Sequence, residues 1–209
     1  MLREAGIPHI AAHPGLEDSD LSPGRVTPAQ WVASLAMLKA SAGLTQALAT
    51  GEPPPLILGA DTTCVADGRL IGTPASAEEA REMIRRFVDR EHEVISGVAL
   101  LTHADGAVRT REMFAVGARV RLGPLGDAEI DRYIETGEWK GKAGGYNLSE
   151  RLAAGWPLTF DGDPTAIMGL PMRALAPRLE TLARRHRHRA DPAAHAGSSQ
   201  AARNGGSPC

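Results

Sequence analysis

Cysteine is scarce in this sequence, which excludes a scaffold held together by disulfide bonds. Two cysteines occur among 209 residues: Cys64 lies within an apolar segment, and Cys209 is the final residue. Small secreted domains that depend on disulfides carry cysteine far more densely. We therefore expect a reducing compartment, the cytoplasm, and we expect Cys64 to be a small apolar residue of the core.

Long apolar runs, aromatic residues and an excess of either charge are also lacking. No apolar run reaches the roughly 18 residues of a membrane span, and the N-terminal MLREAGIPHI lacks the apolar core of a signal peptide. Aromatic residues make up 4% of the chain, so the core must be mainly aliphatic. The formal net charge of −2 gives no basic excess for nucleic-acid binding. We expect neither a membrane partner nor a nucleic-acid partner.

Helix signals are clear in the first third of the chain. Thr27 and Pro28 form a strong helix start, with threonine as the N-cap and proline at the first helical position. The segment that follows places Trp31, Leu35 and Leu38 at a spacing that predicts one apolar face. Upstream, MLREAGIP resembles the last turn of a helix, because glycine and proline close it.

Strand signals follow this helix. Residues 53–65 contain a continuous apolar run, which predicts a central strand buried on both faces, and residues 9–12 read as a short strand. Asp-Gly at 105–106 predicts a hairpin within residues 91–122. The other expected elements are a helix at 77–90 capped by Ser76 and Glu79, a helix at 126–139, a glycine-rich loop at 140–157, a strand and turn at 157–171, and a helix at 172–186. This order predicts an α/β fold with a mixed sheet.

Composition changes near residue 186. From there the chain is polar and rich in glycine, alanine, serine and proline, which is typical of disorder. We therefore divide the sequence into one domain at residues 1–185 and a disordered tail at 186–209.

Asp61 is the residue most suggestive of chemistry. It follows the apolar run in LGADTTCVADGRLIGTP, at what reads as the end of a buried strand. Such a carboxylate often faces the ligand cleft of an α/β protein. The alternative is a structural aspartate that accepts backbone hydrogen bonds from the next turn. Asp161 and Asp163 lie beside a Gly-Pro turn, and the structural role is favoured for both.

Four ordered segments resemble the Maf family of nucleotide pyrophosphatases. They are GADTTCVADGRLIGTP, EHEVISGVALL, IDRYIETGEWKGKAGGY and IMGLPM, and the resemblance extends over roughly residues 1–183. It implies an elongated α/β fold with a central cleft, shared with inosine triphosphate pyrophosphatases. The implied reaction is hydrolysis of a nucleoside triphosphate to the monophosphate and diphosphate with a divalent metal, Mg or Mn. The family often forms homodimers.

The resemblance also implies roles for individual residues. Asp61 matches the catalytic carboxylate, which would activate water directly or through the metal. Lys39, in LAMLKASA, matches a helix lysine that points at phosphate. Asp18 falls near the acidic loop residue of the family and joins Asp61 as a candidate metal ligand, with Glu17 an equal candidate at that position.

Three further positions are assigned to substrate binding. Lys142 lies in a glycine-rich loop, where backbone N–H groups and positive charge suit phosphate. Thr73 stands where the family usually has lysine, and Ser149 stands where it has glutamine. The family also opens with a strand and a Ser-x-Ser-Pro-Arg-Arg phosphate loop, which we expect this sequence to lack.

These departures leave two classes of function open. One is a working nucleoside triphosphate pyrophosphatase. The other is a catalytically weak Maf-like protein that binds nucleotide or a cell-division partner. Two ring-bearing positions have competing interpretations: we expect His92 to be structural, and Trp139 is the better tryptophan candidate for stacking on a base.

Overall fold

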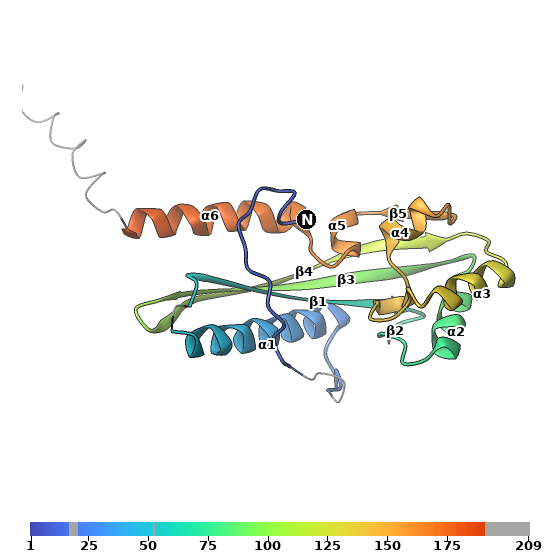
Figure 1. Ribbon diagram of the computed structural model, residues 1–209, viewed down its shortest axis with the longest axis horizontal. Helices are drawn as coiled ribbons and strands as arrows, with labels where there is room; N and C mark the ends of the chain where they lie inside the picture. The colour runs from blue at the N-terminus through green and yellow to red at the C-terminus, as the bar shows by residue number, and fades with distance from the viewer. Residues whose placement is uncertain (17–20, 52, 191–209) are drawn as a thin grey trace, which may run out of the picture. The chain divides into compact units, whose positions relative to one another are not determined.

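The computed structural model describes residues 1–16, 21–51 and 53–190, of which the chain up to Arg173 forms one compact unit (Figure 1). Within these residues the elements are α1 (Pro28–Ala49), β1 (Leu56–Ala66), β2 (Arg69–Ile71), α2 (Ala77–Phe87), β3 (Arg90–Ala104), β4 (Ala107–Leu122), α3 (Asp127–Thr136), a 3-10 turn η1 (Ala143–Gly145), α4 (Leu148–Ala153), β5 (Leu158–Asp161), α5 (Pro164–Ile167) and α6 (Met172–Ala190). The α/β class is confirmed.

The sheet is antiparallel, where the sequence analysis predicts a mixed sheet. Its order is β2-β1-β3-β4-β5, and each neighbouring pair among these strands is antiparallel. A single isolated bridge, Val88 to Leu122, is parallel. The reason is connectivity: β2 and α2 together return the chain so that β3 runs back along β1, and the Asp105-Gly106 hairpin then turns β3 into β4.

The hairpin signal is confirmed in detail. Asp105 and Gly106 have φ angles of 49° and 73°, the left-handed values that a tight hairpin turn requires at both central positions. The strands on either side pair from Arg90 with Leu122 to Ala104 with Ala107. The paired strands β3 and β4 form the centre of the sheet, with β1 beside β3 and β5 beside β4 (Figure 1).

Helix α1 begins as predicted, and its buried face agrees with the prediction only in part. Thr27 Oγ1 accepts the Gln30 amide at 3.2 Å, and the Gln30 side chain accepts the Thr27 amide at 2.9 Å, forming a capping box. The buried positions are Val32, Leu35, Ala36, Ala40 and Leu44, whereas Leu38 is 45% exposed. Leu35 is therefore confirmed as part of the buried face, but Leu38 was wrong, because the small residues Ala36 and Ala40 are the ones that bring the helix close to the sheet.

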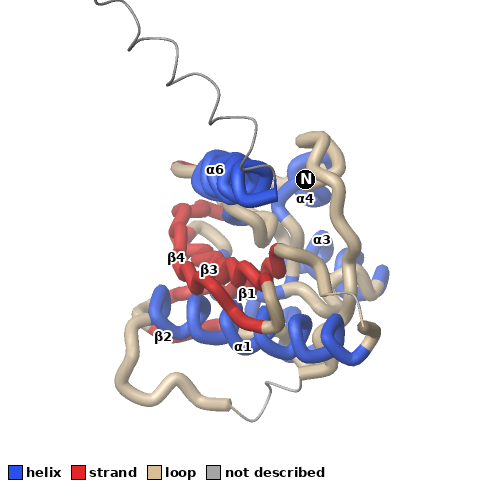
Figure 2. Tube along the Cα trace, turned by 90° about the vertical axis from the view of Figure 1, so that its left-hand side faces the viewer, coloured by secondary structure: helices blue, strands red, loops and turns tan. Residues whose placement is uncertain are grey.

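Helix α1 packs on the sheet at two glycines, and Figures 1 and 2 both show the helix beside β1 and β3. A Cβ atom on Gly59 of β1 would lie 2.2 Å from the Ala36 carbonyl oxygen. A Cβ atom on Gly97 of β3 would lie 2.4 Å from the Val32 carbonyl oxygen. Backbone therefore meets backbone at both points, and no other residue fits without displacing the helix.

A second core lies under α2, α3 and the segment between α3 and β5. Phe87, Ile84, Val120 and Leu122 are at most 1% exposed there. Trp139 belongs to the same core, with 7% of its surface exposed and its Nε1 donating to the Ile134 carbonyl at 3.1 Å. Its ring is therefore committed to packing, which removes it as a stacking candidate for a base.

Several local predictions differ from the structure. Residues 9–12 form no strand, because they find no pairing partner among the described residues. β1 is only partly buried, rather than buried on both faces. The glycine-rich region includes η1 and the short helix α4, whose N-cap Asn147 accepts the Glu150 amide at 3.1 Å.

Helix α1 also departs from the prediction that no segment could span a membrane. By length and composition alone, this 22-residue helix is long and apolar enough to cross a bilayer. Such a match is weak evidence, since the core helix of a soluble protein passes the same test. The contacts at Gly59 and Gly97 identify α1 as a helix packed on the sheet.

The final helix, α6, runs to Ala190 and so extends past the predicted end at residue 186. Pro177 lies inside it, and the Thr181 hydroxyl donates to the Pro177 carbonyl at 2.9 Å. Residues 191–209, the greater part of the predicted tail, lie outside the described residues.

Candidate active site

Asp61 forms an ion pair with Lys39. Lys39 Nζ lies 2.5 Å from Asp61 Oδ1, and the two side chains are 25% and 13% exposed. Lys39 comes from α1 and Asp61 from β1, 22 positions apart in sequence. The structure thus brings together the two residues that the sequence analysis placed at the reaction centre.

The close approach of α1 sets this geometry. Gly59 stands two positions before Asp61 on the same face of β1, since side chains alternate along a strand. Its contact with Ala36 and Ala40 places α1 directly over the sheet. Lys39 stands just before Ala40, so its side chain reaches along the helix flank to Asp61.

Thr62 points to the opposite face, where it joins a buried hydroxyl chain. Its Oγ1 lies 2.6 Å from Ser96 Oγ on β3, and Ser96 in turn donates to the Ala166 carbonyl of α5 at 2.7 Å. A Cβ on Gly169 would lie 3.4 Å from Thr62 Oγ1. The IMGLP segment is therefore fastened to the back of the strand that carries Asp61.

The other predicted binding residues form a second group. The Gly144 amide donates to the Gly72 carbonyl at 3.0 Å, so the glycine-rich loop lies against the segment that carries Thr73. Lys142 forms an ion pair with Glu150 of α4. Ser149 donates to Asn147 Oδ1 at 2.7 Å. Lys142, Thr73 and Ser149 thus stand on neighbouring segments.

Aromatic packing holds this loop in place. The Tyr146 hydroxyl is hydrogen bonded to His92 Nε2 at 2.7 Å, and the His92 ring stacks on Phe87 with centroids 4.1 Å apart. The Tyr133 hydroxyl donates to the Gly145 carbonyl at 2.9 Å. Gly144 has φ 72° and would place a Cβ 2.7 Å from Cys64 Sγ. The glycine-rich loop is therefore held in place by contacts at Gly144, Gly145 and Tyr146.

Metal ligands are sparse among the described residues. In residues 1–16, 21–51 and 53–190, no group of three or more histidine, cysteine, aspartate or glutamate side chains could hold a metal ion. Asp18 and Glu17 lie outside the described residues. Asp61 is therefore the one candidate ligand that the described structure places.

With this geometry established, sequence comparison gives the decisive observation. A family model described as Maf-like protein matches residues 1–182. The chain belongs to the Maf family. The match includes the segments that carry Lys39, Asp61 and Lys142, and the resemblance to the family is confirmed.

Three relatives similar to this chain share one name. A dTTP/UTP pyrophosphatase of Symbiobacterium thermophilum is 36% identical over 82% of this chain and 82% of its own length. One of Salinibacter ruber is 39% identical over 76% of this chain and 73% of its own length. One of Pelotomaculum thermopropionicum is 36% identical over 86% and 88%.

Turn chemistry was the structural alternative for two other aspartates of this Maf chain, and Asp163 has such a local role, whereas Asp161 forms an ion pair between strands. Asp161 pairs with Arg119 of β4 at 2.6 Å. Asp163 caps α5 and accepts from the Thr165 amide at 2.9 Å and the Arg173 amide at 3.2 Å. Burial alone would raise the pKa of Asp163, but these hydrogen bonds lower it below its ordinary value.

His92 gives the Maf domain a measurable dependence on pH. Burial lowers the pKa of His92 from 6.5 to about 4. Because the folded pKa is the lower one, stability is complete above the unfolded pKa and falls as pH drops from 6.5 towards 4. A shift of this size corresponds to about 3 kcal/mol. Urea unfolding of the parent and of His92→Asn at about pH 7 and about pH 4.5 measures how much free energy of unfolding each protein loses between the two pH values.

The expected result is a flatter pH dependence for His92→Asn than for the parent. His9→Asn is the matched control, because His9 is exposed. It should keep the full loss of stability between the two pH values. An equal loss in His92→Asn and the parent would show that another group is responsible.

Proposed function

We propose that this protein hydrolyses nucleoside triphosphates to the monophosphate and diphosphate, acting on pyrimidine substrates such as dTTP and UTP. The observation that carries the proposal is the Lys39–Asp61 pair: the family resemblance assigns Asp61 to catalysis and Lys39 to phosphate binding, and the two side chains are in contact. The names of the relatives support the substrate class.

The chemistry follows from what the pair can do. Asp61 accepts a proton from a water molecule as the water oxygen bonds to the α-phosphorus. The bond from that phosphorus to the bridging oxygen breaks, and diphosphate leaves with the bonding electrons. Lys39 offsets negative charge on the phosphate oxygens at the same place. One carboxylate and one ammonium group thus meet the two main needs of the reaction.

A divalent cation suits the oxygen donors at this site. Magnesium is usually bound by one or two carboxylates together with substrate phosphates, so one protein carboxylate is a sufficient ligand when the substrate supplies the others. Asp61 would hold the ion, with Asp18 or Glu17 as the second candidate ligand from the sequence, and Mg or Mn would supply neutralisation of phosphate charge. Lys39 already lies against Asp61 Oδ1, so the cation and the lysine would share this carboxylate.

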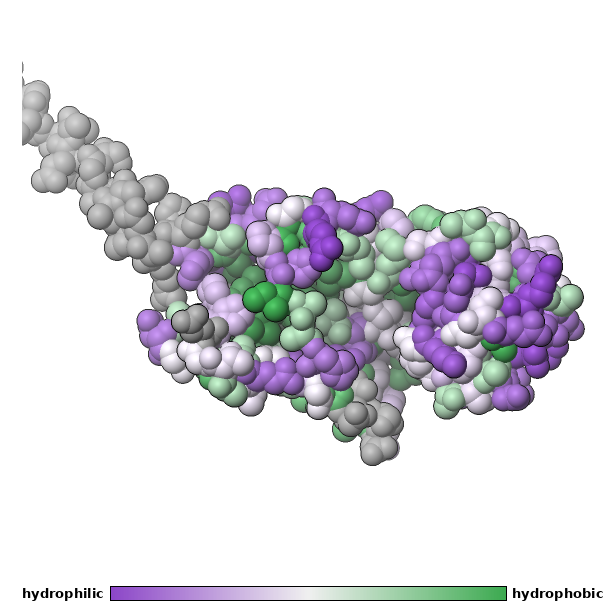
Figure 3. Space-filling view, viewed as in Figure 1, coloured by the Kyte–Doolittle hydropathy of each residue, from purple (hydrophilic) through white to green (hydrophobic). Residues whose placement is uncertain are grey.

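The second group of residues would bind the phosphate chain. Lys142 would exchange its pairing with Glu150 for a phosphate oxygen. The Thr73 and Ser149 hydroxyls would donate hydrogen bonds without adding charge. The surface near α3 and α4 is strongly hydrophilic, as expected beside a site for a charged ligand (Figure 3).

We also propose a cytoplasmic protein. Cys64 is a free, buried thiol, which agrees with a reducing compartment. Burial raises the pKa of Cys64 to about 12, so the thiol stays protonated and serves as a core residue. Homodimer formation, common in the family, stays a prediction.

The test is diphosphate release from dTTP, UTP, CTP, dATP and GTP with Mg or Mn. We expect dTTP and UTP to be cleaved fastest, with the monophosphate and diphosphate formed in equal amounts. Release of inorganic phosphate in place of diphosphate would contradict attack at the α-phosphorus. Nucleotide binding without turnover, by folded protein, would instead support the binding or regulatory class.

A further inference from the structure

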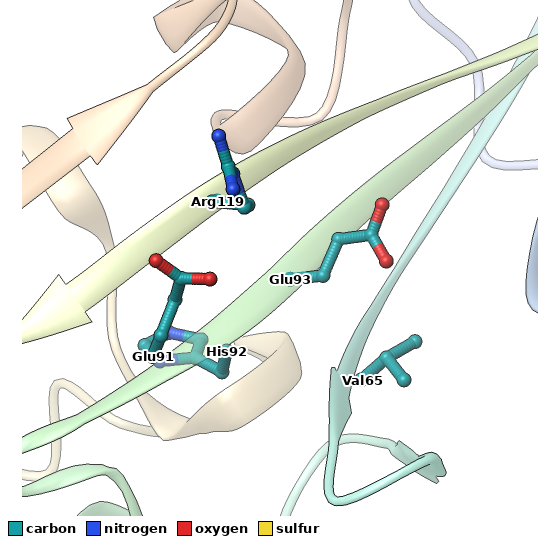
Figure 4. Close-up of a pocket in the computed structure, with 5 residues that line it drawn as sticks. All are labelled: Val65, Glu91, His92, Glu93 and Arg119. Atoms are coloured by element: carbon teal, nitrogen blue, oxygen red, sulfur yellow. The ribbon is translucent and has the colours of Figure 1, made fainter.

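A cavity of about 300 Å³ opens on the sheet near its end closest to α2. Its lining residues are Val65 of β1, Arg119 of β4, and Glu91, His92 and Glu93 of β3 (Figure 4). The His92 side chain, which is 3% exposed, points to the opposite face of the sheet, where its ring stacks on Phe87. The assignments made above to Asp61, Lys39, Lys142, Thr73 and Ser149 include none of these residues.

The cavity lies on the same side of the sheet as Asp61. Val65 pairs with Glu93, Glu93 with Arg119, and Arg119 with Asp161, so these residues form one row across four strands. Directly paired side chains share a face, and positions two apart on one strand share it too. Val65 stands four positions after Asp61, a separation of roughly 13 Å. The row and the Lys39–Asp61 pair therefore lie along one surface.

Two carboxylates at the cavity, those of Glu91 and Glu93, can accept hydrogen bonds from a ligand. Arg119 is engaged by Asp161 at 2.6 Å, which leaves the Glu91 and Glu93 carboxylates facing the cavity (Figure 4). Asp161, Glu91 and Glu93 together raise the pKa of Arg119, with the Asp161 hydrogen bond the largest cause. The Glu93 carboxylate also occupies space over Gly117, where a Cβ would lie 2.4 Å from Oε1. Gly117 thus gives Glu93 room to lie across the sheet.

We propose that this cavity binds the nucleoside end of the substrate, with Glu93 accepting a hydrogen bond from a nucleoside donor. The inference rests on the proposed function and adds the orientation of the substrate to it. Two carboxylates repel a triphosphate, whereas Lys39 beside Asp61 attracts one, so the phosphates lie towards Asp61 and the nucleoside towards Val65. Val65 supplies an apolar wall, and Glu93 supplies an acceptor.

The donor belongs to a group that thymidine and uridine nucleotides share. Both have a ring N–H at position 3 and a 3′-hydroxyl group, and either can donate to a carboxylate. Cytidine has no N–H at ring position 3, so a contact to this position would favour uracil and thymine over cytosine. A contact to the 3′-hydroxyl would not distinguish the bases.

Calorimetric binding of uridine monophosphate and of diphosphate, each titrated separately, tests the proposal without requiring turnover. We expect Glu93→Gln to weaken uridine monophosphate binding about 10-fold, because hydrogen bonds to a charged group are the stronger ones. Diphosphate binding should be unchanged. Glu82→Gln is the matched control, since Glu82 is exposed on α2 and does not line the cavity. It should bind both ligands as the parent does.

The outcomes separate this inference from the proposed function. Equal uridine monophosphate binding by Glu93→Gln and the parent would overturn the nucleoside site, and dTTP hydrolysis by the same variants would then leave the proposed function standing. A parent that binds neither ligand and cleaves no nucleotide would overturn both. Glu93 is exposed, so the variant should fold, and its thermal unfolding confirms this. Methylation of uridine monophosphate at ring position 3, or loss of its 3′-hydroxyl, identifies the donor.

Discussion

Asp61→Asn is expected to reduce diphosphate release about 10³-fold while the protein remains folded. Asparagine keeps the shape of the side chain but cannot take up the proton that water must lose. It also cannot form an ion pair with Lys39, which lies 2.5 Å from Oδ1 in the parent. Initial rates with dTTP, measured beside circular dichroism of the same sample, give both quantities.

A matched control for this change stands on the same hairpin. Asp67→Asn makes the same substitution six positions later, at an exposed turn residue with φ 49°. Asparagine tolerates this left-handed conformation, and the Asp67–Arg90 pair at 3.6 Å is exposed to solvent. The control should keep the parental rate. A rate for Asp61→Asn close to that of Asp67→Asn would remove Asp61 from the mechanism.

Short-range signals predicted the helix starts and the hairpin correctly. The Thr27 cap, the Ser76 cap and the Asp105-Gly106 turn each depend on residues within a few positions of one another. Ser76 Oγ accepts the Glu79 amide at 3.1 Å, as expected. The Glu79 carboxylate, however, accepts the Ala75 amide at 2.8 Å, one residue earlier than a capping box requires. Such signals are readable because the interaction is local.

The direction of the strands could not be read in this way. An apolar run such as β1 looks the same whether its neighbour is parallel or antiparallel. The packed face of α1 was also misjudged, because the choice between Leu38 and Ala36 depends on which side meets Gly59. Strand direction and the packed face of α1 both depend on contacts between residues distant in sequence, so they can be inferred only once the partner strand is known.

The candidate site was predictable in part. Lys39 and Asp61 were identified from their resemblance to family motifs, and the structure places them in contact. The Thr62–Ser96 hydroxyl chain and the Tyr146–His92 bond were missed, because they join residues that lie 34 and 54 positions apart in sequence, respectively. A polar residue in an apolar strand, such as Ser96 in EHEVISGVALL, was the available signal, because a buried hydroxyl requires a partner.

Gly97→Ala is expected to destabilise the protein by about 3 kcal/mol and lower its melting temperature by about 10 °C. The added Cβ would lie 2.4 Å from the Val32 carbonyl carbon and oxygen and 2.5 Å from the Ala33 amide nitrogen. These are backbone atoms of α1, so they cannot move aside as a flexible side chain could. The helix must shift as a body, and Lys39 shifts with it. Urea unfolding measures the stability, and diphosphate release from the folded fraction measures the displacement of Lys39.

Gly43→Ala separates this effect from the ordinary consequences of replacing a glycine. Gly43 lies on α1 at the same interface, but a Cβ there would meet Ile57 Cγ2 at 3.7 Å, an ordinary contact. Alanine in a helix interior is favoured over glycine by roughly 0.5–1 kcal/mol, so this variant should be as stable as the parent or slightly more so. Equal stability of Gly97→Ala and Gly43→Ala would show that α1 can move away from β3 at little cost. A large loss in Gly97→Ala alone, with activity falling further than stability explains, would tie the Lys39–Asp61 pair and the proposed reaction to the close packing of α1 on the sheet.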